Sequence, residues 1–254
     1  MLEVRKLSAG YGGEDVLREV DLRFLPGTLT AVVGKNGCGK STLLKACAGL
    51  LAPRGGQILL QGKALADYES RERAKRISYL AQWGGIPAIT VERFVMHGRH
   101  PHQGYPKRPG REDLEAVERA MIQMGVADFR HKHMSQLSGG ERQRVYLAMH
   151  LAQDAPVMLL DEPTTYMDLG HQLEFLDLLG QLKKDGKCIV MVLHDLQQVL
   201  RCSDRIVAME NGRILCADAP QSLLESGALA DLFGVDITAV DGGEQGMGYL
   251  FAVR

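Results

Sequence analysis

Two hydrophobic periodicities divide the chain. Near the N-terminus, apolar and polar positions alternate over residues 2–7 and 16–25, which predicts two strands joined by the turn AGYGG at residues 9–13. Further along, apolar residues follow one another without alternation in LTAVVG (29–34) and in PVMLLDE (156–162). Such unbroken runs are typical of strands that are buried on both faces of a parallel sheet.

Helical periodicity dominates the middle of the chain, from about Ile89 to Gln153. Apolar residues recur there at intervals of three and four, so two helices each present one apolar face. The faces consist of Leu114, Val117, Met121 and Met124 in one helix, and of Val145, Ala148, Met149 and Ala152 in the other. Further helices are predicted over residues 40–51 and from about Leu169 to Lys183. We therefore expect an α/β fold with a mostly parallel sheet, an N-terminal antiparallel β portion and a helical insertion.

Composition and charge limit the classes of protein to which this chain can belong. The chain has 254 residues, 45% hydrophobic and 24% charged, as in an ordinary globular domain. Its net charge of −1 gives no reason to expect nucleic-acid binding through bulk electrostatics. The apolar runs are far shorter than the roughly 20 residues of a membrane span, and the first residues lack a secretory signal's apolar core. Five scattered cysteines indicate a reducing compartment, and Cys188 is expected to fill a strand.

The segment GKNGCGKS, residues 34–41, matches the full phosphate-binding pattern G-x-x-x-x-G-K-[ST]. It stands between a predicted strand and a predicted helix, which is the context that such a loop requires. Its glycines let successive backbone amides point at a phosphate chain, and the positive end of the helix adds to that field. Lys40 is expected to reach the β- and γ-phosphates, and the Ser41 hydroxyl is expected to hold Mg²⁺.

Two later strands bring polar side chains to the same edge of the sheet. One leaves Asp161 and Glu162 at its carboxyl end, where open α/β sheets bind ligands. Asp161 suits the magnesium shell, and Glu162 is placed to orient and deprotonate an attacking water. The run CIVMVLHD delivers His194 to that edge as well. A lone histidine at a strand end is more often structural, but the neighbouring phosphate site favours a functional one.

The segment LSGGERQR, residues 137–144, opens the second helix of the insertion. Ser138 and Glu141 form a capping-box pattern, and Gly139 and Gly140 expose their amides at the positive end of the helix. This is a second helix start suited to phosphate, whereas the sequence has a single phosphate-binding loop with a lysine. Capping alone leaves open a plain, well-capped helix.

With these motifs in order, the sequence resembles the ATP-binding-cassette (ABC) ATPases over essentially its whole length. GKNGCGKS matches their Walker A loop, VMLLDE their Walker B strand and LSGGE their signature motif. The resemblance assigns Gln82 to the Q-loop, Asp168 to the D-loop and His194 to the H-loop, and Tyr11 to an aromatic position that stacks on adenine. It implies a single ABC ATPase domain over residues 1–254.

The resemblance also implies how that domain is divided and how it works. A P-loop NTPase core would comprise residues 1–83 and 154–254, with a helical subdomain over about 84–153. In a head-to-tail homodimer, each ATP would lie between the Walker A loop of one subunit and the signature motif of the other, which would explain the second phosphate-suited helix. Lys40, Mg²⁺ and the loop amides would offset charge on the transferring phosphoryl group.

Each site residue has an implied role. Glu162 would activate water, His194 would contact the γ-phosphate, and Gln82 would link Mg²⁺ and water to a partner. The implied magnesium ligands, partly through water, are Ser41, Gln82 and Asp161. The implied ATP-binding residues are Tyr11, Gly34, Lys35, Asn36, Gly37, Cys38, Gly39, Lys40, Ser41, Thr42, Ser138, Gly139, Gly140 and Asp168.

The implied function is ATP hydrolysis that energises solute import. Permease subunits in the membrane would be direct partners and a solute-binding protein an indirect one. The subunit would lie peripherally on the cytoplasmic face of the inner membrane, with no nucleic-acid partner. GRHPH and DEPTTYMDLGHQ resemble importers for iron–siderophores, haem and vitamin B12. One alternative is a soluble ABC ATPase that acts on ribosomes or DNA, but such proteins usually have two cassettes or inserted arms. A second alternative is a small-molecule kinase, which the LSGGE motif disfavours.

The segment VMHGRHPHQG holds three histidines within residues 95–104. No cysteine or acid lies within several residues of them, and Pro101 stiffens the backbone, which disfavours a metal site. A solvated helix end without a partner is one interpretation. We instead predict a polar docking surface for the permease that includes Arg99, His100 and His102.

Overall fold

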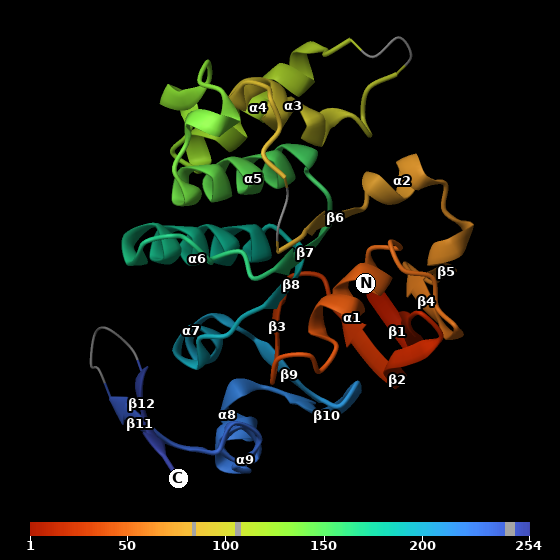
Figure 1. Ribbon diagram of the computed structural model, residues 1–254, viewed down its shortest axis with the longest axis vertical. Coiled ribbons are helices and arrows are strands. Elements are labelled where there is room, and N and C mark those ends of the chain that lie inside the picture. Colours follow the sequence, from red (N-terminus) through yellow and green to blue (C-terminus); the bar gives the residue numbers. More distant parts are fainter. Residues whose placement is uncertain (83–84, 105–107, 242–246) are drawn as a thin grey trace.

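The computed structural model describes residues 1–82, 85–104, 108–241 and 247–254. A six-stranded sheet of order β10-β9-β3-β8-β7-β6 forms its centre (Figure 1). All neighbouring strands of this sheet run parallel except β10, which pairs antiparallel with β9. The strands are β3 (Leu29–Gly34), β6 (Ile77–Leu80), β7 (Val157–Asp161), β8 (Cys188–Val192), β9 (Arg205–Glu210) and β10 (Arg213–Asp218). The mostly parallel sheet is the predicted one.

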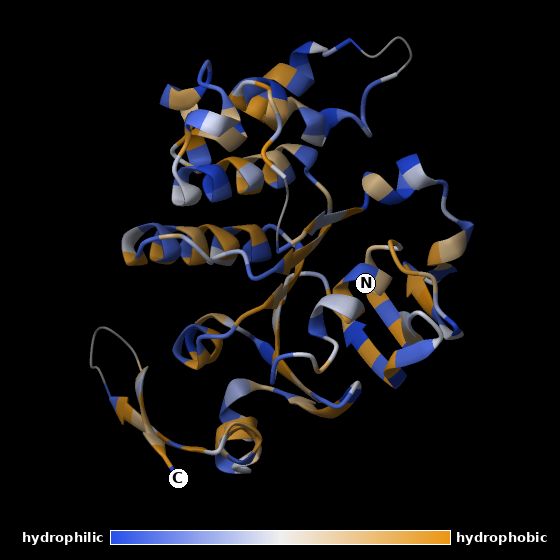
Figure 2. Cartoon of the chain, in the orientation of Figure 1, coloured by the Kyte–Doolittle hydropathy of each residue, from blue (hydrophilic) through white to orange (hydrophobic). Residues whose placement is uncertain are grey.

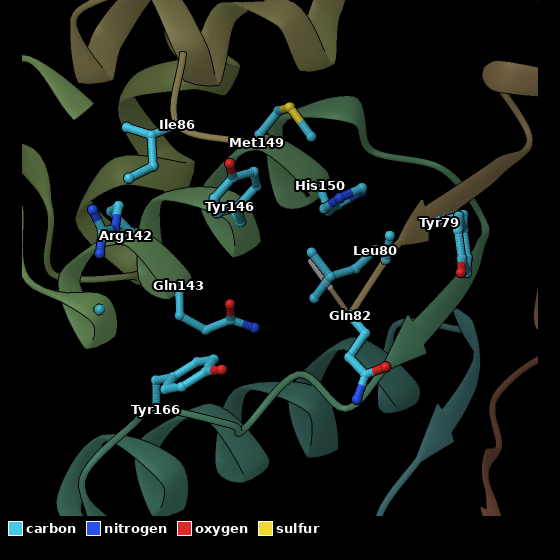
Figure 3. A pocket seen from close by; sticks show the side chains of 12 residues that line it. Tyr79, Leu80, Gln82, Ile86, Arg142, Gln143, Tyr146, Met149, His150 and Tyr166 are labelled. Carbon is cyan, nitrogen blue, oxygen red and sulfur yellow. The ribbon is translucent and has the colours of Figure 1, made fainter. Parts of the chain in front are cut away.

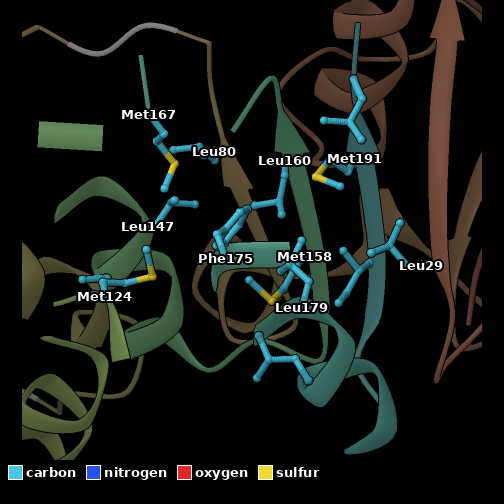
Figure 4. Packing of buried hydrophobic residues seen from close by; sticks show 14 of the residues in the cluster. Leu29, Leu80, Met124, Leu147, Met158, Leu160, Met167, Phe175, Leu179 and Met191 are labelled. Atoms are coloured by element: carbon cyan, nitrogen blue, oxygen red, sulfur yellow. The ribbon is translucent and has the colours of Figure 1, made fainter. Parts of the chain in front are cut away.

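Both faces of the central strands are buried, as their unbroken apolar runs predicted. In β7, Met158 and Leu160 join a core with the helices, whereas Leu159 joins a second core with the N-terminal strands. Figure 4 shows Phe175 and Leu179 packed beside Met158 and Leu160 in the first core. Hydrophobic residues accordingly concentrate along the central strands (Figure 2).

The N-terminal strands form a separate antiparallel sheet of order β2-β1-β4-β5. Alternate residues of β2 are buried from Val20 to Phe24, so the period of two seen in the sequence there reflects one covered face. The covered face packs on α1, which follows the phosphate-binding loop. These elements are β1 (Leu2–Tyr11), β2 (Glu14–Phe24), α1 (Lys40–Cys47), β4 (Gly55–Leu60), β5 (Lys63–Ala64) and α2 (Ser70–Ala74).

Helix α1 is shorter than predicted. The sequence suggested a helix over residues 40–51, but α1 ends at Cys47. Gly49 then adopts a φ of 71°, a left-handed conformation that ends helices and that glycine adopts without strain. A side chain at Gly49 would also meet Arg73, since an added Cβ would lie 2.8 Å from Arg73 Nε.

Three helices pack together at the top of Figure 1: α3 (Val91–Met96), α4 (Arg111–Gln123) and α5 (Gly139–Gln153). The predicted apolar faces hold except at Leu114, whose side chain is exposed. The buried stripe of α4 is centred on Val117, Ala120 and Asp113, so Leu114 lies at its margin in the first turn. Gly84, where the helical subdomain was predicted to begin, lies outside the described residues.

The C-terminal part completes the cover of the sheet. Helix α6 agrees closely with its prediction, and a two-stranded sheet of β11 and β12 ends the chain. Within the described ranges, no helix is long and apolar enough to cross a membrane. These elements are α6 (Leu169–Lys184), α7 (Leu196–Cys202), α8 (Pro220–Glu225), α9 (Ala228–Phe233), β11 (Val235–Asp241) and β12 (Met247–Val253).

Candidate functional site

The loop between β3 and α1 has the backbone that its glycines predicted. Gly34, Gly37 and Gly39 have φ values of 147°, 80° and 107°, which favour glycine. A Cβ at Gly34 would lie 2.2 Å from the Met209 carbonyl oxygen, so a side chain there would clash with β9. The loop therefore needs glycine both for its curvature and for its close approach to the sheet.

Lys40 is buried at the start of α1 and bends back across this loop. Its ammonium donates hydrogen bonds to the carbonyl oxygens of Gly34 at 2.8 Å and Lys35 at 3.1 Å. Cys38 and Thr42 are buried as well, whereas Lys35 and Asn36 are exposed. The charge of Lys40 is thus fixed at the mouth of the loop, where phosphates are expected to bind.

Ser41 and Asp161 come together as predicted, although 120 residues separate them. The Ser41 hydroxyl donates to Asp161 Oδ1 at 3.1 Å. Burial raises the pKa of Asp161, and the hydrogen bonds from Ser41 and Tyr79 lower it in part. Repulsion from the neighbouring Glu162 carboxylate adds to the rise. A hydroxyl and a carboxylate side by side are the hard oxygen donors that Mg²⁺ prefers, so these residues fit the ion.

Tyr79 belongs to this cluster but was missed in the sequence. Its hydroxyl donates to Asp161 Oδ2 at 3.3 Å, so both carboxylate oxygens of Asp161 accept a hydrogen bond. Burial and the neighbouring Asp161 raise the pKa of Tyr79, which keeps the phenol protonated. Its position in β6, three residues before Gln82, was the available signal, because β6 is parallel to β7 and adjacent to it.

Glu162 is the centre of a second cluster, which joins three loops. Gln82 Nε2 donates to Glu162 Oε2 at 2.8 Å, and His194 Nε2 lies 2.5 Å from Glu162 Oε1. Glu162 itself has a φ of 54°, and its amide donates to the Val192 carbonyl oxygen of β8 at 3.2 Å. The structure thus brings together the three residues predicted to act on water and the γ-phosphate. The left-handed backbone turns the Glu162 carboxylate out of the strand line.

Tyr11 ends β1 with its ring about half exposed. Lys45 of α1 places its ammonium 5.9 Å from the centroid of that ring. The ring is therefore close to the helix that follows the phosphate-binding loop, as a base-stacking residue requires.

The predicted capping box at the start of α5 is present. The Ser138 hydroxyl accepts from the Glu141 amide at 3.3 Å, and the Ser138 amide donates to Glu141 Oε2 at 2.7 Å. The backbone and side chain of Ser138 lower the pKa of Glu141. Ser138 and Gly139 are exposed, on the helical part of the molecule and away from α1 (Figure 1). Within one subunit, the helix α5 and the helix α1 that follows the phosphate-binding loop therefore lie apart.

Asp168 caps α6 and links to α5 through two residues that the sequence did not single out. Asp168 Oδ1 accepts from the His171 amide at 3.0 Å, and Oδ2 lies 2.7 Å from His171 Nδ1. The other imidazole nitrogen, Nε2, lies 2.9 Å from Arg144 Nη1. The signal available for His171 was its position three residues after Asp168, which is the spacing between a helix-capping residue and its reciprocal partner.

A cavity of about 400 Å³ lies between Gln82 and α5 (Figure 3). Leu80, Ile86 and Tyr146 give it a largely apolar lining. Gln82 therefore faces this cavity on one side and contacts Glu162 on the other.

The docking surface predicted around VMHGRHPHQG is wrong at Arg99, and the half-buried His102 contacts the end of α5. Arg99 is buried, and its guanidinium donates to Asp113 Oδ1 at 2.9 Å and to the Ala152 carbonyl oxygen at 3.0 Å. His102 Nε2 lies 2.8 Å from the Gln153 carbonyl oxygen. These side chains tie the loop to α4 and α5, because the helix ends leave carbonyl groups that need donors.

The rest of the segment supports the same interpretation. A Cβ at Gly98 would lie 2.2 Å from the Met149 carbonyl oxygen, so the loop packs directly on the backbone of α5. Arg71 of α2 donates to the carbonyl oxygens of Pro101 and Gln103. Asp113, the acid that the sequence did not connect to this loop, has a lowered pKa: burial raises it, but the hydrogen bonds from Arg99 and the Gly110 amide outweigh burial. The segment is a structural junction.

Comparisons with known proteins agree with this geometry. A family model described as ABC transporter matches residues 17–165. YusV of Bacillus subtilis (strain 168), named a probable siderophore transport system ATP-binding protein, is 41% identical over 92% of this chain and 86% of that protein. The ferric enterobactin transport ATP-binding protein FepC of Escherichia coli (strain K12) is 39% identical over 94% and 89%. The cobalamin import ATP-binding protein BtuD of Halobacterium salinarum is 40% identical over 88% of this chain and 56% of its own length.

Solved structures share the fold. The ATP-binding subunit of an ABC transporter matches with a TM-score of 0.82 and 25% identity, over 92% of this chain and 98% of that chain. A bacterial ABC transporter cassette solved as a dimer matches with a TM-score of 0.79 and 25% identity, over 87% and 99%.

Proposed function

Because the chain belongs to the ABC transporter family, we propose that it is the ATP-hydrolysing subunit of an importer for iron–siderophores, haem or cobalamin. The observation that carries the proposal is the Glu162 cluster. A carboxylate held by Gln82 and His194 stands one residue beyond the Ser41–Asp161 pair, at the edge where the phosphate-binding loop lies. The siderophore and cobalamin importers among the relatives support the substrate class.

In the proposed mechanism, Glu162 acts as general base toward the attacking water. His194 and Gln82 each occupy one oxygen of its carboxylate, which fixes the carboxylate's orientation before reaction. Lys40 and the amides of the glycine-rich loop oppose charge on the transferring phosphoryl group. Ser41 and Asp161 would hold Mg²⁺, which when bound neutralises phosphate charge. Tyr79 holds the Asp161 carboxylate in place.

We propose that two copies form the working ATPase. Ser138 and Gly139 are exposed at the N-terminus of α5, a position that favours an anion, but α5 lies apart from α1 and the loop at Lys40. A head-to-tail pair would bring the start of α5 and this loop together across ATP, with Tyr11 stacking on the adenine and Asp168 near the shared site. The dimeric cassette among the matching structures supports this arrangement.

We propose that the permease acts on the site through Gln82. The side chain of Gln82 faces the cavity beside α5 and also holds Glu162, so a permease segment seated in the cavity would touch the residue that orients the base. This replaces the docking surface at Arg99 and His102. The subunit would then lie peripherally at the cytoplasmic face of the membrane, with a solute-binding protein as an indirect partner.

The packing of α3, α4 and α5 on one another supports a helical subdomain of about 84–153 inserted in a core of 1–83 and 154–254.

Purification of the subunit with its associated proteins, followed by transport assays, tests the proposed function. We expect a membrane permease to co-purify. The reconstituted complex should import a ferric siderophore, haem or cobalamin only with ATP present. Co-purification with ribosomes or DNA, without a permease, would contradict the proposal and favour the soluble class.

A further inference from the structure

Arg144 in the second turn of α5 and His171 in the first turn of α6 tie the two helices together. Arg144 Nη1 contacts His171 Nε2 at 2.9 Å, and the same nitrogen lies 3.5 Å from the Gly125 carbonyl oxygen after α4. The backbone hydrogen bonds from Ser138 and His171 lower the pKa of Glu141 and of Asp168, the acids of the two helix caps, and the charge of Arg144 adds to both shifts. A small cavity of about 80 Å³ is lined by these side chains together with Ser138 and Gly140.

The chemistry of this contact fixes the state of the imidazole. A guanidinium has only donors, so Nε2 of His171 must be the acceptor for Arg144. The single ring proton then lies on Nδ1 and donates to Asp168 Oδ2 at 2.7 Å. A doubly protonated ring would set an N–H group against the guanidinium. The imidazole thus connects an acid on the D-loop to a cation on the signature helix.

The backbone of the two loops is also in contact. An added Cβ at Gly140 would lie 2.9 Å from the carbonyl oxygen of Tyr166, and one at Gly139 would lie 3.7 Å from Tyr166 Cβ. Tyr166 has a φ of 69°, an uncommon conformation that needs support from its surroundings. The signature loop and the D-loop therefore pack as one surface, and the Arg144–His171 contact closes that surface from the side.

We infer that His171 is a positioning residue for ATP hydrolysis, which fixes the signature loop to the D-loop of the same subunit. This inference rests on the proposed function. His171 lies at the start of α6 and contacts α5 through Arg144, and both helices lie apart from α1, which follows the phosphate-binding loop. Its loss should therefore spare ATP binding by one subunit and impair the turnover that needs the signature loop of the other.

Two substitutions separate the two nitrogens of the ring. His171→Gln can place an amide oxygen near the Nε2 position and keep an acceptor for Arg144. His171→Asn can place an amide N–H near the Nδ1 position and keep the donor to Asp168, but it loses Arg144. The cap of α6 survives in both, since it uses the backbone amide of residue 171. Asp177→Ala, at an exposed position on α6, is the matched control.

Steady-state hydrolysis by the subunit, alone and assembled with its permease, gives the readout. His171→Ala and His171→Asn should lose about tenfold in kcat with KM for ATP within about twofold, because a hydrogen bond to a charged group is lost. His171→Gln should recover most of the wild-type rate, and Asp177→Ala should match it. Combining His171→Ala with Arg144→Ala should cost less than the sum of the two single losses, since both changes remove the Arg144–His171 contact.

Several results would overturn the inference: kcat of His171→Ala within twofold of wild type, equal rates for His171→Asn and His171→Gln, or additive losses in the double variant. Equal ATP binding by single subunits, measured directly, excludes a general loss of folding as the cause of a low kcat. A wild-type complex that fails to hydrolyse ATP contradicts the proposed function instead, so the two failures are distinguishable.

Discussion

Individual side chains in this protein show how position decides chemistry. Asp161 and Glu162 are neighbours in sequence, yet Asp161 ends a strand and contacts Ser41, whereas Glu162 has a left-handed backbone and contacts His194. That change of backbone directs one carboxylate to the proposed metal position and the other to the proposed water position. Position can also remove reactivity. Burial raises the pKa of the Cys47 thiol to about 12, so this thiol stays protonated and unreactive.

Glu162→Gln should nearly abolish turnover while leaving nucleotide binding intact. The amide keeps the shape of the carboxylate but cannot accept a proton, and loss of a positioned base costs about 10²–10⁴ in rate. The variant should accumulate as an ATP-bound dimer, which size-exclusion chromatography with and without ATP detects. A kcat within threefold of wild type would remove Glu162 from the role of general base.

His150 should make the fold less stable in mild acid. Burial lowers the pKa of His150 from 6.5 to about 4, so between these values the unfolded chain binds a proton that the folded chain does not. Stability present above pH 6.5 is therefore lost as the pH falls toward 4. Denaturant titrations should show a loss of about 2 kcal/mol from this residue between pH 7 and pH 5. His150→Leu should flatten that dependence, and equal slopes for both proteins would contradict the assignment.

Helices and strands show what local pattern can and cannot predict. The central strands were predictable because unbroken apolar runs require burial on both faces. The cap at Ser138 and the glycine-rich loop were predictable because their signals are local. The exposure of Leu114 was not predictable, since this residue fits the helical period of α4 but lies off the centre of the buried stripe. Arg99 was misassigned because its partner, Asp113, is 14 residues away. No periodicity reports a contact at that separation.

Arg99→Ala should destabilise the packing of α3 on α4 and α5 rather than abolish a docking surface. The change leaves Asp113 buried without its cation, and breaking a buried ion pair in this way costs about 3 kcal/mol. Urea unfolding should detect the loss. His97→Ala, an exposed neighbour, is the control and should change stability by less than about 0.5 kcal/mol. Unchanged stability of Arg99→Ala together with lost transport would restore the docking interpretation.

At the level of the assembled protein, sequence motifs identified the two parts of the site but not the contacts that connect them. Walker A, Walker B and signature residues each follow a local rule of turn, strand end or helix cap. Tyr79 and Arg144 follow no such rule, because each acts by touching a residue from another element. Which surfaces meet between two copies is likewise a property of the assembled fold, so it needs a test across subunits.

Mixing two inactive variants provides that test. Lys40→Ala removes the charge facing the phosphates, and Ser138→Arg blocks the exposed start of α5; each homodimer should then have two defective sites. A mixed dimer has one site with both Lys40 and Ser138 intact, because the two residues of a shared site come from different subunits. Equal mixing should therefore restore about a quarter of the wild-type rate, since about half of the dimers are mixed and each has one intact site of two. If both residues instead served the site within one subunit, every site in the mixture would stay defective. Complete inactivity of the mixture, with mixed dimers verified by two affinity tags, would contradict the head-to-tail arrangement.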